Sequence, residues 1–317
     1  MHTNENQDVR ETRPARLIAV GNRINPQAAA TEHSFSAELE RIVGMTVPYF
    51  AVDRPNLVAL GEMLGLPLAI SGKRGYLSRQ VYLPDGPGVY NTGFLWGPDG
   101  RLIGTTDKVY LTDSEKATLD LTPGELDNVE AFETEIGKIG MAISLDAFIP
   151  EYLHQLDSLG TTIVIQNDAN DQPWASPSKA CEWQPQEWLN SVLGSLQDDY
   201  PHLYLNICPM QVGNFFDVTF DGQSTITRKS DNEPDPYCNF VGNEGFVHTV
   251  TGKALKGDIL AVSPWVEEDP IKSGAEMSLA ERRSALEQVA RQLLPGGARA
   301  NQYLEAVVWA DVDVPVW

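Results

Sequence analysis

Short apolar runs, each bounded by glycine, proline or polar residues, constrain the fold more than any other feature of the sequence. Three of them occupy residues 56–60 (NLVAL), 139–143 (IGMAI) and 161–166 (TTIVIQ). A run of this length without regular polar alternation is typical of a strand that is buried on both faces. Helical patterns at residues 34–43 and 184–196 alternate with such runs. This alternation of strands and helices predicts an α/β fold.

Turn signals place the remaining elements. Pro98-Asp99-Gly100 joins two apolar segments, and we expect a β-hairpin there, with Lys108 in its second strand. Proline fixes φ and glycine tolerates a positive φ, as such a turn requires. A helix is expected to begin near Pro150, since proline is tolerated in a first helical turn. The other expected elements are strands at residues 16–24, 202–207, 223–228, 245–250 and 258–262, and a helix at residues 278–293.

The chain has no internal repeat and no break in composition, so we expect a single folded domain. Residues 1–15 are polar and are expected to form a flexible N-terminal arm, and residues 16–300 would form the domain. Residues 301–317 end in apolar, β-branched and aromatic side chains. We expect them to form an extended tail that packs on the body or on a second subunit.

The overall charge excludes some classes of function. Lys and Arg number 23 against 44 Asp and Glu, which gives a formal net charge of −21. Such a charge repels nucleic acids and anionic membranes. The N-terminus lacks the apolar core of a signal peptide, and no uncharged run has the length of a membrane span, so we expect a soluble, cytoplasmic protein. The odd set of Cys181, Cys208 and Cys238 has no CxxC spacing, which argues against a disulfide framework or a zinc site.

Polar residues whose side chains can take part in catalysis lie at or near the ends of three apolar segments. Glu62 follows residues 56–60, Ser144 follows residues 139–143, and Lys108 lies in the expected hairpin. Ligand sites in α/β sheets gather at the carboxyl ends of strands. A carboxylate, an ammonium and a hydroxyl that meet there would supply a general base, an electrostatic stabiliser and a nucleophile.

Four segments together resemble the nitrilase superfamily of carbon–nitrogen hydrolases, and its amidase-like members in particular. PNLVALGE resembles the motif that ends in the catalytic glutamate, and YNTGFLWGPDGRLIGTTDKVYLTDSE resembles the segment with the catalytic lysine. GKIGMAISLDAFIPE resembles the motif G-x-x-I-C-x-D-x-x-x-P-E around the nucleophile, and NICPMQVGNFFDVTFDGQSTI resembles a later pair of strands. The resemblance extends from about Arg16 to Val262 in segment order.

The resemblance implies a four-layer α-β-β-α sandwich and covalent acyl transfer without a cofactor or a metal. Glu62 would be the general base, and Lys108 and the main-chain N–H of Leu145 would stabilise the oxyanion. Residue 144 would be the nucleophile, and Glu115 would be a second glutamate that supports the site. Family members form homodimers or larger homo-oligomers, so we expect the same here.

Two positions depart from the family pattern. Gly61 stands where proline usually precedes the catalytic glutamate, and Ser144 stands where the family has its cysteine. A serine hydroxyl is a far weaker acid than a thiol and needs a well-placed base. Three interpretations of Ser144 remain open: an engineered Cys→Ser change, a natural loss of activity, or a working serine nucleophile.

Several residues have a structural alternative to a catalytic one. Glu115 either supports catalysis or caps the segment that follows it. Asn167 and Asp168 follow the strand at residues 161–166, where they would line a substrate pocket or simply form a turn.

The resemblance predicts a carbon–nitrogen hydrolase of amidase type. Leu145-Asp146 follows the nucleophile position where true nitrilases usually have Trp-Glu, so a small amide or carbamoyl substrate is preferred over a nitrile. The alternative is a non-catalytic binding or scaffold protein with the same fold, and a further alternative is a nitrilase or an amide-forming acyl transferase.

Overall fold

The computed structural model describes residues 11–25, 28, 31–62, 88–117, 119–171, 184–215, 218–233, 237–241, 247–250, 255–263 and 305–316. The helix expected at residues 278–293 lies outside them. Among the described residues, no helix has both the length and the apolar character that crossing a membrane would require.

The first sheet has three strands and joins both ends of the described chain. The central strand, β1 (Thr12–Gly21), pairs in parallel with β2 (Asn56–Leu60) and antiparallel with β15 (Ala306–Pro315). Residues 12–15, which we expected in the N-terminal arm, therefore belong to β1, where Ala15 is fully buried. Residues 306–315 of the expected tail pack on the body of the same chain.

The second sheet has six strands in the order β14-β11-β8-β7-β6-β5. Its centre is the parallel set of β6, β7 and β8, with antiparallel strands on both sides. The bounds are β5 (Ala131–Thr134), β6 (Gly137–Ile143), β7 (Ile163–Asn167), β8 (Leu205–Cys208), β11 (Thr225–Arg228) and β14 (Asp258–Val262). The sequence predicted all of these except β5, whose short segment AFET has two polar side chains in four.

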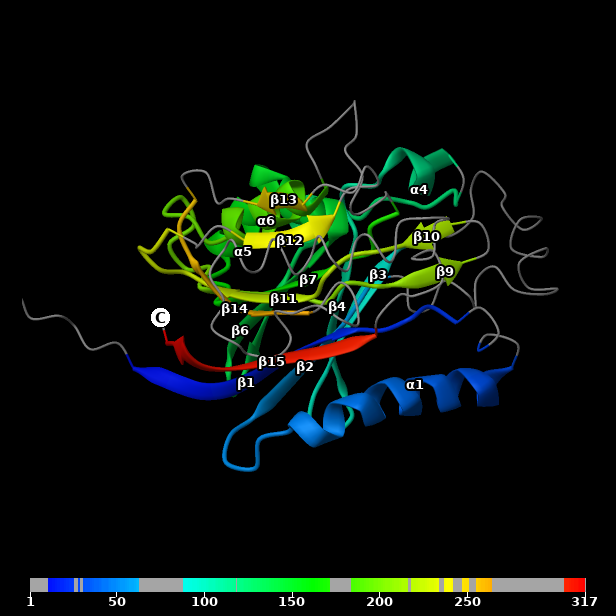
Figure 1. Cartoon of the computed structure of the whole chain (residues 1–317), viewed down its shortest axis with the longest axis horizontal. Coiled ribbons are helices and arrows are strands. Elements are labelled where there is room, and N and C mark those ends of the chain that lie inside the picture. Colours follow the sequence, from blue (N-terminus) through cyan, green and yellow to red (C-terminus); the bar gives the residue numbers. More distant parts are fainter. Residues whose placement is uncertain are drawn as a thin grey trace, which may run out of the picture.

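Helices cover the outer faces of the two sheets, as Figure 1 shows. On the outside of the first sheet, Ile42 of α1 (Glu32–Thr46) packs against Ile18 and Val20 of β1. On the outside of the second sheet lie α5 (Pro150–Ser158) and α6 (Gln184–Gly194). The main core fills the space between the sheets, where Leu17 of β1 belongs to the same cluster as Met141 of β6. These four layers confirm the predicted α-β-β-α sandwich.

The expected hairpin is also present. β3 (Thr92–Trp96) pairs antiparallel with β4 (Leu102–Asp107), and Gly100 in the turn has a φ of 76°. We expected Lys108 inside the second strand of the hairpin. In the structure β4 ends at Asp107, and Lys108 is the next residue.

Shorter elements complete the described chain. They are α4 (Asp113–Ala117), β9 (Gly213–Phe215), β10 (Val218–Phe220), β12 (Tyr237–Val241), β13 (Val247–Val250) and the 3-10 turns η2 (Val47–Tyr49), η3 (Leu126–Asn128) and η4 (Ser144–Phe148).

The carboxyl ends of strands from both sheets meet at one place. Asn167, the last residue of β7, donates its side-chain amide to the carbonyl of Leu60 at 2.7 Å. The N–H of Glu62 donates to the carbonyl of Asp168 at 3.3 Å. Gly61 lies so close to the main chain of Gln211 that a Cβ there would be 2.7 Å from its nitrogen. Gly61 thus allows the two sheets to approach each other beside Glu62.

Candidate active site

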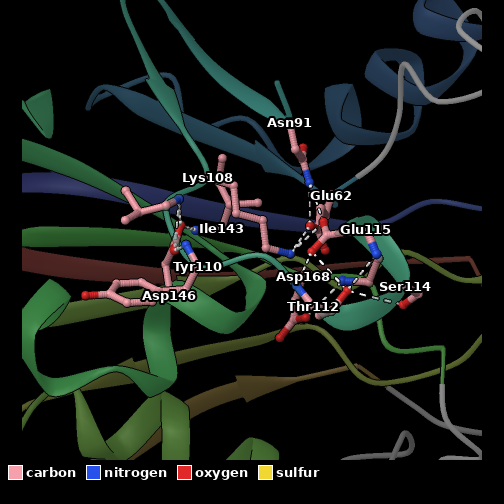
Figure 2. A network of polar contacts seen from close by, with 12 residues as sticks. Glu62, Asn91, Lys108, Tyr110, Thr112, Ser114, Glu115, Ile143, Asp146 and Asp168 are labelled. Atoms are coloured by element: carbon pink, nitrogen blue, oxygen red, sulfur yellow. Dashed lines mark hydrogen bonds and ion pairs between the residues drawn. The ribbon is translucent and has the colours of Figure 1, made fainter. Parts of the chain in front are cut away.

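Lys108 is buried between two glutamates. Its Nζ donates to Oε1 of Glu62 at 2.8 Å and to Oε1 of Glu115 at 2.9 Å (Figure 2). Lys108 is 1% exposed, and Glu62 and Glu115 are each 3% exposed. At this degree of burial, Glu62 is not a surface carboxylate at the end of a strand, and Lys108 is not a solvated lysine of the hairpin. The three residues, together with Asn91 described next, are called the lysine cluster below.

Asn91 completes this cluster, although the sequence analysis did not single it out. Its side-chain amide donates to Oε1 of Glu62 at 2.7 Å and to Oε1 of Glu115 at 3.2 Å. Asn91 precedes β3 directly, and its carbonyl accepts the main-chain N–H of Lys108 at 2.8 Å. A polar residue at the start of a hairpin strand, opposite Lys108 in the pairing, is the signal that could have identified it.

Glu115 binds two parts of the chain at once. Its Oε1 contacts Lys108, and its Oε2 accepts the N–H and the hydroxyl of Thr112 at 2.8 and 3.1 Å. Thr112 immediately precedes α4, so Glu115 caps this helix and also fixes the lysine. The two alternatives from the sequence are therefore compatible.

Burial and charge oppose each other within the cluster. Burial disfavours the charged form of Lys108, but the two glutamates outweigh it and hold the pKa of the lysine above its usual value. Burial raises the pKa of Glu62 to about 7, because Lys108 offsets it only in part and the Asp168 and Glu115 charges add to it. For Glu115, Lys108 and the Thr112 N–H outweigh burial, so its pKa is lowered. Glu62 is thus the carboxyl of the lysine cluster that can exchange a proton near neutral pH.

Ser144 lies in a strained turn directly after β6. Its φ of 49° falls in the left-handed region, which non-glycine residues adopt at a cost of about 1–2 kcal/mol. The turn continues as η4, whose second residue is Leu145. The first N–H groups of a helical turn have no partner within that turn, so the Leu145 N–H is suited to bind an anion.

Asp168 lies at the strand end next to that of Ser144. The register of β6 and β7 pairs Ile143 with Asn167, so residues 144 and 168 follow neighbouring strand ends. Asp168 is 6% exposed, and burial raises its pKa although Lys108, Ser144 and Gln166 oppose this. By contrast, the amide nitrogen of its neighbour Asn167 is engaged by Leu60.

Asp146 connects the Ser144 turn to the Lys108 loop. Its carboxylate accepts the main-chain N–H groups of Tyr110 at 2.8 Å, Val109 at 3.2 Å and Ile143 at 3.2 Å, and Figure 2 shows it beside the lysine cluster. Burial raises the pKa of Asp146 to about 7 against these hydrogen bonds. The sequence analysis assigned Asp146 no role, although the aspartate of the motif around the nucleophile was a usable signal.

Two other features bear on the site. In the described ranges, no group of His, Cys, Asp and Glu has an arrangement that could hold a metal ion. Cys208, at the end of β8, is a buried free thiol whose pKa is raised by burial and by the neighbouring Asp168 charge. A thiol with a raised pKa is a poor nucleophile.

The sequence matches a model of one enzyme family. Residues 67–228, more than half of the chain, match the model described as carbon-nitrogen hydrolase. This range includes Lys108, Glu115 and Ser144 and begins five residues after Glu62. Among curated protein sequences, none matches this chain.

Two solved structures with TM-scores above 0.5 show the same fold, and a third is reported with them. A carbon-nitrogen hydrolase from Helicobacter pylori is 18% identical with a TM-score of 0.51, over 69% of this chain and 83% of its own. A glutamine-dependent NAD+ synthetase from Acinetobacter baumannii is 13% identical with a TM-score of 0.55, over 94% of this chain and 45% of its own. Nit3 from Saccharomyces cerevisiae, a member of branch 10 of the nitrilase superfamily, is 19% identical with a TM-score of 0.49, over 68% of this chain and 83% of its own.

The family match and the sandwich fold agree with each other and with the order of the four motifs. This chain belongs to the carbon–nitrogen hydrolase family.

Proposed function

We propose that the chain is an amidase-type hydrolase that cleaves the carbon–nitrogen bond of a small amide or carbamoyl compound, with Ser144 in the position of the nucleophile. The observation that carries this proposal is the buried Lys108, held by Glu62 and Glu115 at the strand ends that also carry Ser144. A protein that only binds a ligand has no physical reason to bury an ammonium between two carboxylates, since their desolvation is costly.

Each residue of the site has a role in this chemistry. Ser144 attacks the carbonyl carbon, and its strained turn exposes the hydroxyl at the end of a rigid strand. An ammonium has three N–H groups. Two of the N–H groups of Lys108 bind Glu62 and Glu115 in the described structure. The third N–H group, together with the N–H of Leu145, stabilises the oxyanion. Glu62 exchanges protons with the leaving nitrogen and with water, as its pKa near 7 favours. Glu115 positions Lys108.

Further properties are part of the same proposal. Asn167 and Asp168 would contribute to the pocket. No cofactor would be needed, and the protein would act in the cytoplasm as a homodimer or a larger homo-oligomer. These expectations rest on the family resemblance.

The direct test is ammonia release from a panel of small primary amides and carbamoyl compounds. The chain is compared with Ser144→Cys and with Ser144→Ala, which keeps the backbone but removes the nucleophile. We expect turnover with at least one substrate, and none by the alanine variant.

The outcomes separate the interpretations of Ser144. Turnover by both the serine and the cysteine forms would establish a working serine. Turnover by the cysteine form alone would identify a disabled hydrolase. If neither form releases ammonia from any compound, the amidase proposal fails and a binding protein with this fold is the better interpretation.

A further inference from the structure

Asn91 binds both glutamates of the lysine cluster at the same time. Its amide nitrogen lies 2.7 Å from Oε1 of Glu62 and 3.2 Å from Oε1 of Glu115. Nζ of Lys108 contacts the same two oxygens at 2.8 and 2.9 Å. The two nitrogens and the two oxygens thus form a closed ring of hydrogen bonds (Figure 2). An asparagine amide has two N–H groups, so each carboxylate can receive one.

The main chain fixes Asn91 relative to Lys108. The carbonyl of Asn91 accepts the N–H of Lys108 at 2.8 Å. The adjacent residues, Thr92 and Asp107, pair in the β3–β4 ladder, and the Thr92 hydroxyl donates to the Asp107 carboxylate at 2.6 Å. The Asn91 side chain is therefore mounted on the end of a paired hairpin, beside the lysine with which it shares its two partners.

A purely structural role at the end of the hairpin would need only the carbonyl of Asn91. Every residue has this carbonyl, so the pairing with Lys108 does not require an asparagine. The side-chain amide, by contrast, supplies its donors to two buried carboxylates. The contacts of the amide with Glu62 and Glu115 therefore explain why this residue type stands at position 91.

The amide differs from a second cation in its effect on Glu62. A hydrogen bond donated to a carboxylate favours the ionised form. Among the charged groups that face Glu62, Lys108 lowers its pKa, and Glu115 and Asp168 raise it. A further ammonium or guanidinium there would hold the pKa well below neutral pH. The neutral amide supports the ionised form while the pKa of Glu62 stays at about 7, where the carboxyl can both accept and release a proton.

Asn91 and Lys108 also fix the rotation of the Glu62 carboxyl group. Both of the described hydrogen bonds to this group end on Oε1, at 2.7 and 2.8 Å. Two donors on one oxygen resist a rotation of the group that would exchange Oε1 for Oε2. A base takes up a proton at one oxygen, and it acts faster when that oxygen is held in place.

We propose that Asn91 is a positioning residue of this site, whose amide holds the Glu62 carboxylate ionised and in one rotation, with Oε1 bound and Oε2 left to take up a proton. The proposal rests on the proposed function for the role of Glu62, and on the ring of hydrogen bonds for its geometry. Asn91 acts through Glu62 and exchanges no proton itself.

The first test measures the ionisation of Glu62 directly, without any substrate. The full chain is isotope-labelled at the side-chain carboxyl carbons of glutamate and titrated by NMR, and the Glu62 signal is the one that Glu62→Gln lacks. Asn91→Leu has a side chain of similar size without donors, so the midpoint of Glu62 should rise by about one pH unit or more. Asn91→Ala should raise it less, because water can enter the space and donate in place of the amide.

The matched control is Asn56→Leu. Asn56 begins β2, at the opposite end of the strand from Glu62, and its amide donates to the carbonyl of Ala51 at 3.0 Å. Loss of this contact should lower the melting temperature and leave the Glu62 midpoint unchanged. A shift in this control as large as that in Asn91→Leu would show that the midpoint reports only stability, and it would overturn the proposal.

The second test uses amide turnover, measured in the Ser144→Cys form if the serine form is inactive. Asn91→Leu should shift the midpoint of the kcat/KM profile upward by the same amount as the Glu62 signal. Above this midpoint kcat should stay about tenfold low with KM nearly unchanged, because the carboxyl group rotates more freely. Activity lowered equally at every pH, with the midpoint in place, would mean that Asn91 is only a structural residue.

The two proposals fail separately. Amide turnover with a Glu62 midpoint that neither Asn91→Leu nor Asn91→Ala moves would keep the hydrolase and remove the role of Asn91. A midpoint that depends on Asn91, without turnover of any amide by the serine or the cysteine form, would keep the effect of Asn91 on Glu62 and remove the amidase.

Discussion

The lysine cluster and the Ser144 turn lie side by side but are held by different forces. In the cluster, side chains bind side chains: Lys108 lies within 2.9 Å of two carboxylates, and Asn91 binds both of these. At the turn, the main chain determines the position of Ser144, since this residue directly follows β6 and has a φ of 49°. One half of the site depends on charge, and the other depends on backbone geometry.

Because of this difference, substitutions in the lysine cluster and substitutions at the Ser144 turn should affect the protein in different ways. A charge removed from the cluster leaves buried groups without a partner, which affects stability and chemistry together. A change at the turn alters the chemistry with little electrostatic consequence. Asp146 connects the two halves, because it binds the main chain on both sides.

The largest effect is expected for Lys108→Met. The substitution removes the oxyanion donor and leaves three buried carboxyls without their ammonium. We expect hydrolysis to fall at least about 10³-fold and the free energy of unfolding to fall by about 3–5 kcal/mol. Amide turnover and thermal unfolding measure the two effects. Lys138→Met is the control. It removes a part-exposed pair with Glu133 and a hydrogen bond to the carbonyl of Leu159, so it should leave turnover unchanged and lower the free energy of unfolding by only about 1 kcal/mol.

The second prediction concerns Glu62→Gln, which should lower kcat/KM about 10²-fold. Lys108, Asn91, Glu115 and Asp168 face this carboxyl. If Glu62 is the general base, it must begin ionised, so wild-type kcat/KM should rise as pH rises through about 7. In the variant this step in the pH profile should be absent. A wild-type rate that instead falls through pH 7 would mean that Glu62 must begin protonated and that another group accepts the serine proton.

The same variant should be more stable than the wild type at alkaline pH. The pKa of Glu62 is about 7 in the folded protein against 4.5 for an ordinary glutamate. The folded chain therefore binds more protons than the unfolded chain between these values, and its stability falls as pH rises from about 4.5 to about 7. Glu62→Gln removes this cost. Its free energy of unfolding should therefore exceed that of the wild type by about 1–3 kcal/mol at pH 8 and should equal it near pH 4.5. Denaturant titration at both pH values measures this.

A smaller effect is expected for Asp146→Asn. The amide keeps one acceptor oxygen but turns an NH₂ group toward main-chain donors, so the Lys108 loop and the Ser144 turn should separate slightly. We expect kcat to fall about tenfold with KM nearly unchanged, because misplacement of catalytic groups affects the chemical step. Steady-state kinetics measure this split. A change in KM alone would place Asp146 in substrate binding instead.

The sequence predicted three of the four residues of the lysine cluster. Glu62 and Lys108 were singled out because they lie at or near the ends of apolar segments, the family resemblance added Glu115, and the structure brings the three together. The fold was also predictable: runs such as NLVAL formed strands at the expected residues, because apolar periodicity and turn chemistry are local.

The remaining parts depend on tertiary pairing. That Asp168 lies at the strand end next to that of Ser144 follows from the register of β6 with β7, which no single segment encodes. β1 begins at Thr12 because β15, almost 300 residues away, pairs with it. Gly61 was regarded only as a looser substitute for proline, whereas the nearby main chain of Gln211 leaves no room for a Cβ.

The smallest effect isolates the strain of the turn. Ser144→Ala and Ser144→Gly both remove the hydroxyl, so neither should hydrolyse an amide. They differ in the backbone, since alanine must still adopt a φ of 49° and glycine does so freely. Glycine also has more conformational freedom in the unfolded chain, which offsets part of this gain. We therefore expect the glycine variant to be the more stable of the two by about 1 kcal/mol in denaturant unfolding. A more stable alanine variant would show that the turn carries no strain.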